Sequence, residues 1–308
     1  MIDSKSEWYQ ETTITFQQVL DQVASNLNEI HSVNYSTRYW NIFLGPWLQQ
    51  FIDMVMLRMF EIEQHSKFQV VNAETQLAAS LKDFNQQAKF SMLVESLHAD
   101  VLAQLNAPIK PTATESHTGK KTLDPILNVK PGRTFVSATY LPRLKEVLLQ
   151  LRFGRLPQRF QYSQPSISTV SQKYRALICR TSRSLTGNAQ IVLVLLPKYM
   201  PSVYLEGFNS LFHSEKPWKL KAFPSVIFTA NRHLYDDVFN FWTALATEHG
   251  SRLVLAQHGG NYGISEFPSF SERHENLVAD RYITWGWSST GPTYKGFALP
   301  LIGRALHS

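Results

Sequence analysis

The sequence predicts an α/β fold in which a helical N-terminal region precedes a parallel sheet. Apolar residues recur at helical spacing over residues 14–30, and a broader apolar face follows over residues 34–60. After residue 133, short runs of β-branched and aromatic residues alternate with stretches of helical period. That order of strand and helix is typical of a parallel sheet with helices packed on it.

The N-terminal region, residues 1–106, is expected to be almost wholly helical. Its second apolar segment is broad enough to require burial on more than one side. Two further helices are predicted at 74–84 and 91–105. Residues 107–132 then turn to Pro, Thr, Ser, Lys and Gly without periodicity, which predicts a linker.

Residues 133–290 are predicted to form a Rossmann-like α/β domain. Its predicted strands are 134–138, 226–229, 253–256 and 282–284, and its predicted helices are 142–152 and 236–248. The strands are continuously apolar, which indicates a sheet covered on both faces and joined by right-handed crossovers. Ligands of such sheets bind beyond the carboxyl ends of the strands.

Composition excludes several classes of protein and partner. The net charge is +6, but the basic residues are scattered, so we expect no nucleic-acid partner. The basic excess fits anionic substrates handled near an anionic membrane, with at most peripheral membrane contact; a merely solvated surface is the alternative. Cys179 is the only cysteine, which excludes an intrachain disulfide and a Cys-rich metal site.

The sequence lacks the patterns of a secretory signal, a membrane span and the common cofactor-binding motifs. Residues 1–10 lack the apolar run of a secretory signal, and polar residues interrupt the apolar stretch 42–60, so we expect a cytoplasmic protein. Phosphate-binding, dinucleotide-binding, metalloprotease and serine-hydrolase motifs do not occur. We expect no cofactor and no metal.

The main candidate site is the turn at residues 257–263, which follows the strand at 253–256 and contains Gly259, Gly260 and Gly263. It is called the glycine turn below. His258 titrates near neutral pH, so it can act as a general base or bind an anion. Neighbouring glycines allow close approach of a ligand. We assign substrate binding to Gln257, Gly259, Gly260 and Tyr262; the alternative is a turn histidine bonded to backbone.

A second polar turn follows the strand at 226–229. Asn231, His233 and Tyr235 are candidates for substrate binding, and Asp236 is a candidate catalytic residue. The alternative for Asp236 and Asp237 is a role at the N-terminus of the following helix, where a carboxylate is favourable.

Three further charged residues complete the candidates. Glu266 and Glu275 follow the glycine turn, and either carboxylate can orient the His258 imidazole or take part in acid–base chemistry. Arg38 can hold an anionic group through two hydrogen bonds. The alternatives are solvated carboxylates and, for Arg38, a role at the start of a helix.

Four segments together resemble a known family. They are residues 34–47, 227–231, 257–263 and 279–287. They resemble bacterial transferases for lipopolysaccharide and other surface polysaccharides. That family has a GT-B arrangement of two Rossmann-like halves and is distantly similar to Kdo transferases and to polyol-phosphate transferases.

The resemblance implies sugar transfer from a nucleotide-activated donor to a glycan acceptor. It implies that His258 and its glycines line the cleft, with Asn231, Tyr235, Asp236 and Glu275 as neighbours. Members of the family are longer, with a C-terminal half for the donor nucleotide, so we expect residues 291–308 to begin that half or to form a tail. Two alternatives follow: a truncated, non-catalytic remnant or subunit of a split enzyme whose partner chain supplies the missing half, and a CDP-polyol phosphotransferase.

Overall fold

The computed structural model describes residues 5–64, 97, 100–101, 134–153, 170–180, 184–213, 223–288 and 293–295. These residues divide between two compact units whose segments interleave along the chain. Unit 1 draws on residues 1–40, 47–121 and 165–213, and unit 2 draws on 41–46, 122–164 and 214–308. Each unit is described by itself.

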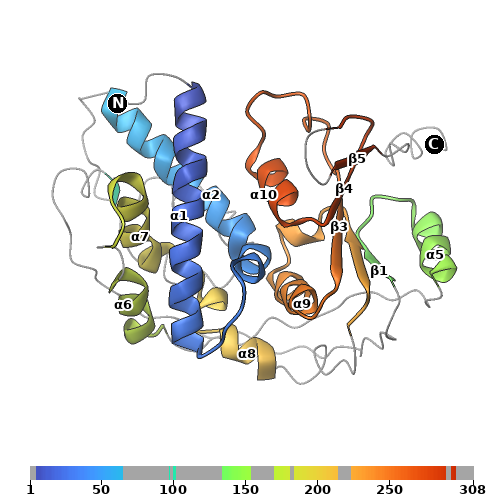
Figure 1. The fold of residues 1–308 in the computed structure, drawn as a ribbon, viewed down its shortest axis with the longest axis horizontal. Coiled ribbons are helices and arrows are strands. Elements are labelled where there is room, and N and C mark those ends of the chain that lie inside the picture. Colours follow the sequence, from blue (N-terminus) through green and yellow to red (C-terminus); the bar gives the residue numbers. More distant parts are fainter. Residues whose placement is uncertain are drawn as a thin grey trace. The chain divides into compact units, whose positions relative to one another are not determined.

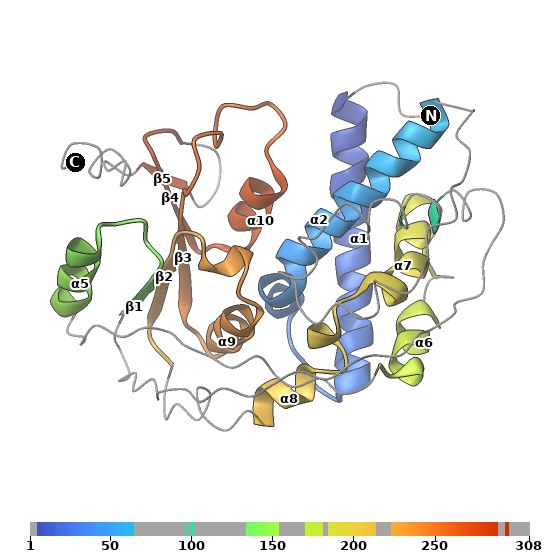
Figure 2. The same cartoon turned by 180° about the vertical axis from the view of Figure 1, so that it is seen from behind.

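In the described residues of unit 1 every element of secondary structure is a helix (Figures 1 and 2). Its helices are α1 (Lys5–His31), α2 (Thr37–Gln64, of which residues 41–46 belong to unit 2), α6 (Gln172–Arg180), α7 (Gly187–Tyr199) and α8 (Phe208–His213), with a short 3-10 helix, η3 (Ser202–Tyr204). α1 packs against α6 and α7. Its predicted apolar stripe is confirmed, because Phe16, Val19, Val23 and Leu27 are buried.

The second predicted helix is confirmed as α2, and its broad apolar face is buried as expected. Trp40, Phe43, Leu44 and Trp47 each have no more than 1% of their surface exposed. The predicted helix 74–84 lies outside the described residues, and of 91–105 only residues 97 and 100–101 are described, all as helix.

Unit 2 contains a five-stranded parallel sheet with the strands in chain order. Its strands are β1 (Thr134–Ser137), β2 (Val226–Thr229), β3 (Arg252–Ala256), β4 (Arg281–Thr284) and β5 (Thr293–Lys295). The α/β class is therefore confirmed, with helices first and a parallel sheet after them. The four predicted strands occur within one residue of their expected ends.

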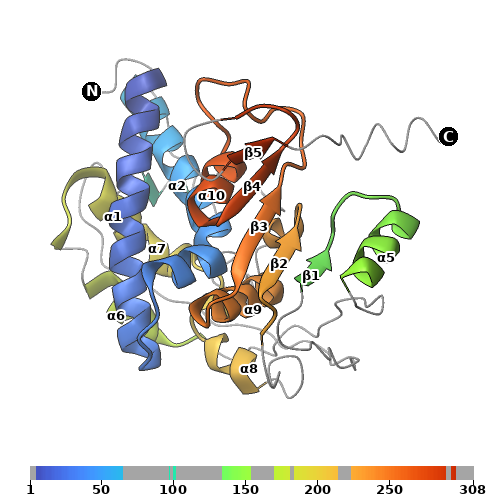
Figure 3. The same cartoon turned by 45° about the vertical axis from the view of Figure 1, so that its right-hand side comes forward.

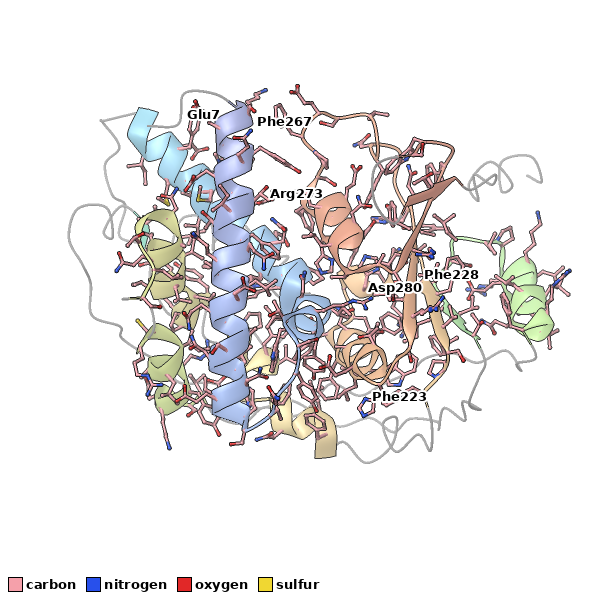
Figure 4. All side chains as sticks on the ribbon, viewed as in Figure 1. Glu7, Phe223, Phe228, Phe267, Arg273 and Asp280 are labelled. Carbon is pink, nitrogen blue, oxygen red and sulfur yellow. The ribbon has the colours of Figure 1, made fainter. Side chains whose placement is uncertain are left out.

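The helices of the sheet are α5 (Arg143–Arg152), after β1, α9 (Asp237–Glu248) and α10 (Phe270–Val278). α9 and α10 lie on the same face (Figures 1 and 3). Right-handed crossovers between strands in sequential order place their helices on one face. Ile227 and Leu255 are therefore buried, whereas Phe228, labelled on β2 in Figure 4, points to the other face and is partly exposed. The sequence predicted helices on both faces of the sheet. The two described helices between β2 and β4, α9 and α10, cover one face only (Figure 1).

None of the helices in the described part of the chain is both long enough and apolar enough to cross a membrane.

The close approach of α2 to α10 within unit 2 depends on Gly45. A Cβ atom at this position would lie 2.2 Å from the Asn41 Oδ1 atom and 2.7 Å from the His274 Nε2 atom. Both neighbouring side chains are buried, so they have little room to move. The packing therefore requires the absence of a side chain here.

We expect Gly45→Ala to lower the free energy of unfolding by about 1–3 kcal/mol through overpacking. Because alanine favours a helix more than glycine does, helix propensity alone would raise the free energy of unfolding by about 1 kcal/mol. The sign of the measured change therefore shows which of the two effects is larger. Gly260→Ala is the control, because its Cβ would meet nothing within 4 Å. Urea unfolding of both variants makes the measurement, and a stabilised Gly45→Ala protein would contradict the packing described.

Candidate functional site

Three strand ends bring polar side chains to one edge of the sheet in unit 2. β1 is followed by Tyr140, β2 by Asn231 and His233, and β3 by His258. The strands are parallel, so their carboxyl ends meet at this edge. A backbone hydrogen bond from Ala230 N to Ala138 O, 3.0 Å long, continues the pairing of β1 and β2 beyond the strands.

His258 lies among polar partners and keeps some contact with solvent. Its Nδ1 atom is 3.3 Å from the Glu275 Oε1 atom, and its side chain is 15% exposed. The Tyr262 hydroxyl lies 3.0 Å from Nε2 and 3.2 Å from Nδ1. Burial lowers the pKa of His258, against an opposing effect of Glu275 and with a smaller contribution from His233. The imidazole is therefore neutral at neutral pH and able to accept a proton.

Glu275, on α10, is the centre of this cluster and is fully buried. The hydroxyl of Tyr282 donates to its Oε2 atom at 2.7 Å, and the hydroxyl of Tyr262 donates to Oε1 at 3.3 Å. Burial raises the pKa of the Glu275 carboxyl to about 7, although His258 and the two tyrosine hydroxyls oppose the rise. A carboxyl with this pKa exchanges a proton near neutral pH, as an acid–base group requires.

His233 supplies a further contact to the same carboxyl. It lies in the 3-10 helix η4 (Arg232–Leu234), with its Nε2 atom 3.1 Å from the Glu275 Oε1 atom. Burial lowers the pKa of His233 to about 3, so the ring is neutral. A proton on Nε2 then makes the ring a hydrogen-bond donor to the carboxyl.

Gln257 holds the glycine turn in place from inside. Its Nε2 atom donates to Gly259 O at 2.7 Å. Its Oε1 atom accepts from Trp285 N at 2.9 Å and from the Trp287 indole at 2.8 Å. Gly263, with φ +72°, allows the turn to pass Trp287, because a Cβ there would lie 2.3 Å from the indole. The structure thus gives Gln257 a positioning role; its predicted contact with substrate stays a prediction.

Tyr140 was not among the candidates from the sequence. Its phenol oxygen accepts a hydrogen bond from Asn231 Nδ2 at 2.7 Å. Its ring is parallel to that of His258 within 7°, with 6.5 Å between the centroids. Ala138 and Tyr140 have φ of 52° and 61°, a conformation that costs residues other than glycine energy and that often occurs at functional sites.

Asp236 caps a helix, which is the alternative considered from the sequence. Its Oδ1 atom accepts from Phe239 N at 2.8 Å in the first turn of α9. Its Oδ2 atom accepts from Arg232 Nε at 2.7 Å, and Arg232 also donates to the Ser137 hydroxyl at 2.9 Å. The carboxylate therefore fixes the turn between β2 and α9. A catalytic role for Asp236 stays a prediction.

The remaining candidates are spread more widely. Tyr235 and Gly260 are exposed in the two turns, and Glu266 is exposed in the loop before α10. Arg38 belongs to unit 1, in the first turn of α2. Within the described residues, no group of three or more His, Cys, Asp or Glu side chains could hold a metal ion.

Comparisons with known proteins give one match. A family model described as LIC12162 family transferase matches residues 3–305. The comparison with curated proteins and the comparison with solved structures gave no match. The matched range covers both units.

Replacement of Glu275 by glutamine tests its burial. The ordinary pKa of this carboxyl is 4.5 and the folded value is about 7, so its contribution to stability is complete below pH 4.5 and is lost as the pH rises through 7. One pH unit corresponds to about 1.4 kcal/mol, so the unfolding free energy of the wild type should fall by about 3 kcal/mol relative to Glu275→Gln over this range.

Urea unfolding at several pH values makes this measurement. Glu266→Gln, which replaces an exposed carboxyl of the preceding loop, is the control and should follow the wild type at each pH. A constant difference between wild type and Glu275→Gln from pH 4.5 to pH 8 would show that Glu275 is not buried as described.

Proposed function

The chain belongs to the LIC12162 family of transferases, and we propose that it transfers a sugar from a nucleotide-activated donor to a glycan acceptor in the synthesis of a bacterial surface polysaccharide. The family match supports a transferase. The finer proposal draws on the resemblance of four sequence segments to surface-polysaccharide transferases and on the acid–base cluster at the carboxyl edge of the sheet.

The observation that carries the proposal is a neutral, partly exposed imidazole in contact with a buried carboxyl. Transfer to a hydroxyl requires a base that accepts the hydroxyl proton as the oxygen attacks. In the proposed reaction His258 takes this proton, the acceptor oxygen forms a bond to the anomeric carbon, and the bond to the donor phosphate breaks. The nucleotide leaves with that electron pair.

Glu275 supports the base in two ways. Its Oε1 atom lies 3.3 Å from Nδ1 of His258, so the carboxylate favours the tautomer with the proton on Nδ1 and the lone pair on Nε2. In the proposed reaction the acceptor hydroxyl takes the place of the Tyr262 hydroxyl, 3.0 Å away, at Nε2 and gives up its proton there. The negative charge of Glu275 stabilises the imidazolium that forms. The donors of Tyr282 and His233 hold the carboxyl in position, so these two residues act through Glu275 and not on the substrate.

Turnover of donor by variants tests the assignment. We expect His258→Ala to reduce release of free nucleotide from a UDP-, CMP- or CDP-linked donor by at least about 100-fold, the usual contribution of a general base. His249→Ala is the matched control, because this histidine is exposed at the end of α9, and its activity should equal that of the wild type.

Full activity of His258→Ala would overturn the assignment. Release of CMP from a CDP-polyol, together with transfer of polyol phosphate to the acceptor, would favour the polyol phosphotransferase instead. Absence of turnover together with absence of donor binding in calorimetry would favour the non-catalytic remnant.

The pH profile gives an independent check. Because burial lowers the pKa of His258, the acid limb of kcat/KM should lie below the ordinary histidine value of 6.5. Glu275 opposes this lowering, so the acid limb of Glu275→Gln should move to still lower pH. An acid limb that stays in place in Glu275→Gln would mean that the two groups are not coupled.

A further inference from the structure

Helix α5 of unit 2 turns its polar side chains toward the sheet. The Oε2 atom of Glu146 accepts from the Thr139 hydroxyl at 2.7 Å and from Thr139 N at 3.2 Å. Gln150 is buried and donates to Val136 O at 3.4 Å. The inner face of α5 is therefore held by hydrogen bonds to β1 and its turn.

The outer face of α5 is apolar. Leu144, Leu148 and Leu151 are 71%, 56% and 47% exposed. Their spacing of four and three residues places them in one row along the helix. Phe153, the residue that ends the helix, is 42% exposed as well. Surface helices of soluble domains bury such an apolar row. In α5 the apolar row is exposed and the polar side chains face the sheet, so the exposed leucines require an explanation.

Basic residues flank the leucine row on both sides. At about 3.6 residues per turn, Lys145 and Arg152 lie along one side of the row and Arg143 lies beyond the other. All three are exposed. Among the described residues, no carboxylate pairs with them, since the acidic residue of α5, Glu146, is turned inward. The outer face thus combines an apolar centre with positive charge only.

We propose that α5 binds to the surface of an anionic membrane, with the leucine row inserted among the lipids and the basic residues on their headgroups. An apolar row with basic flanks is the pattern of helices that lie in a membrane interface. The inference does not depend on the proposed transfer reaction.

The size of the surface argues against a protein partner, including a second copy of the chain. α5 has ten residues and is about 15 Å long. One row of side chains on such a helix is far smaller than the roughly 800 Å² that each partner buries in a stable protein interface. Protein interfaces are also depleted in lysine, whereas anionic lipid attracts it.

Sedimentation with vesicles tests the proposal on the full chain. The wild type should sediment with vesicles of phosphatidylcholine and phosphatidylglycerol, and much less with phosphatidylcholine alone. Leu144→Ser/Leu148→Ser/Leu151→Ser should weaken partitioning into the mixed vesicles by at least about tenfold. The control is Leu57→Ser/Ile264→Ser/Leu277→Ser, three exposed apolar residues outside α5, and it should bind like the wild type.

The contribution of charge is separated by a second variant. Arg143→Gln/Lys145→Gln/Arg152→Gln keeps the leucines, so its binding to mixed vesicles should fall to the level seen with phosphatidylcholine alone. All substituted side chains are exposed, and unchanged circular dichroism is expected as a check of folding.

Three results would overturn the proposal. The first is a wild type that sediments with neither kind of vesicle. The second is a leucine variant that binds like the wild type. The third is a dimeric wild type that the leucine variant converts to a monomer in light scattering, because the row would then bind a second copy of the chain.

Discussion

Burial of the Glu275 carboxyl is the constraint on which the carboxyl edge of the sheet depends. A charged or unsatisfied carboxyl away from water is strongly unfavourable, so its surroundings must supply donors. They come from separate parts of the chain: Tyr282 from β4, His233 from η4 and Tyr262 from the glycine turn. His258 lies at the same oxygen. The requirement of one carboxyl thereby fixes the relative positions of three segments that carry the candidate site.

The helix that carries Glu275 is itself fixed from its other side. The adjacent residue, His274, is buried, and its Nε2 atom lies 2.9 Å from Asn41 O in the part of α2 that belongs to unit 2. Gly45 makes this approach possible. At the N-terminus of α10, the Ser269 hydroxyl accepts from the backbone of the first turn, and a carboxylate of that turn accepts from Gly263 N. α10 is therefore anchored at its N-terminus and at its middle, which gives the Glu275 carboxyl a defined place.

Much of unit 2 could be predicted because its signals are local. Apolar runs between turn residues gave the strands, and a histidine directly after a strand pointed to His258. Local signals could not decide between Glu266 and Glu275, because both carboxyls lie in the segment that follows the glycine turn. Which of them faces the sheet depends on where α10 begins. Tyr282 resembled any other strand residue, and no glycine marks the left-handed turn at Tyr140. The grouping of α6, α7 and α8 with the N-terminal helices depends on contacts between distant segments, which periodicity does not contain.

The turn after β1 links the two surfaces proposed here. Tyr140, beside His258, and Arg143, at the start of α5, are separated by two residues. The Thr139–Glu146 hydrogen bonds join this turn to the inner face of the helix. A helix bound to lipid would hold the turn, and with it the carboxyl edge of the sheet, within a short distance of the membrane surface. An acceptor attached to lipid would then meet the base without leaving the bilayer, whereas a freely dissolved acceptor would gain nothing from the exposed leucines.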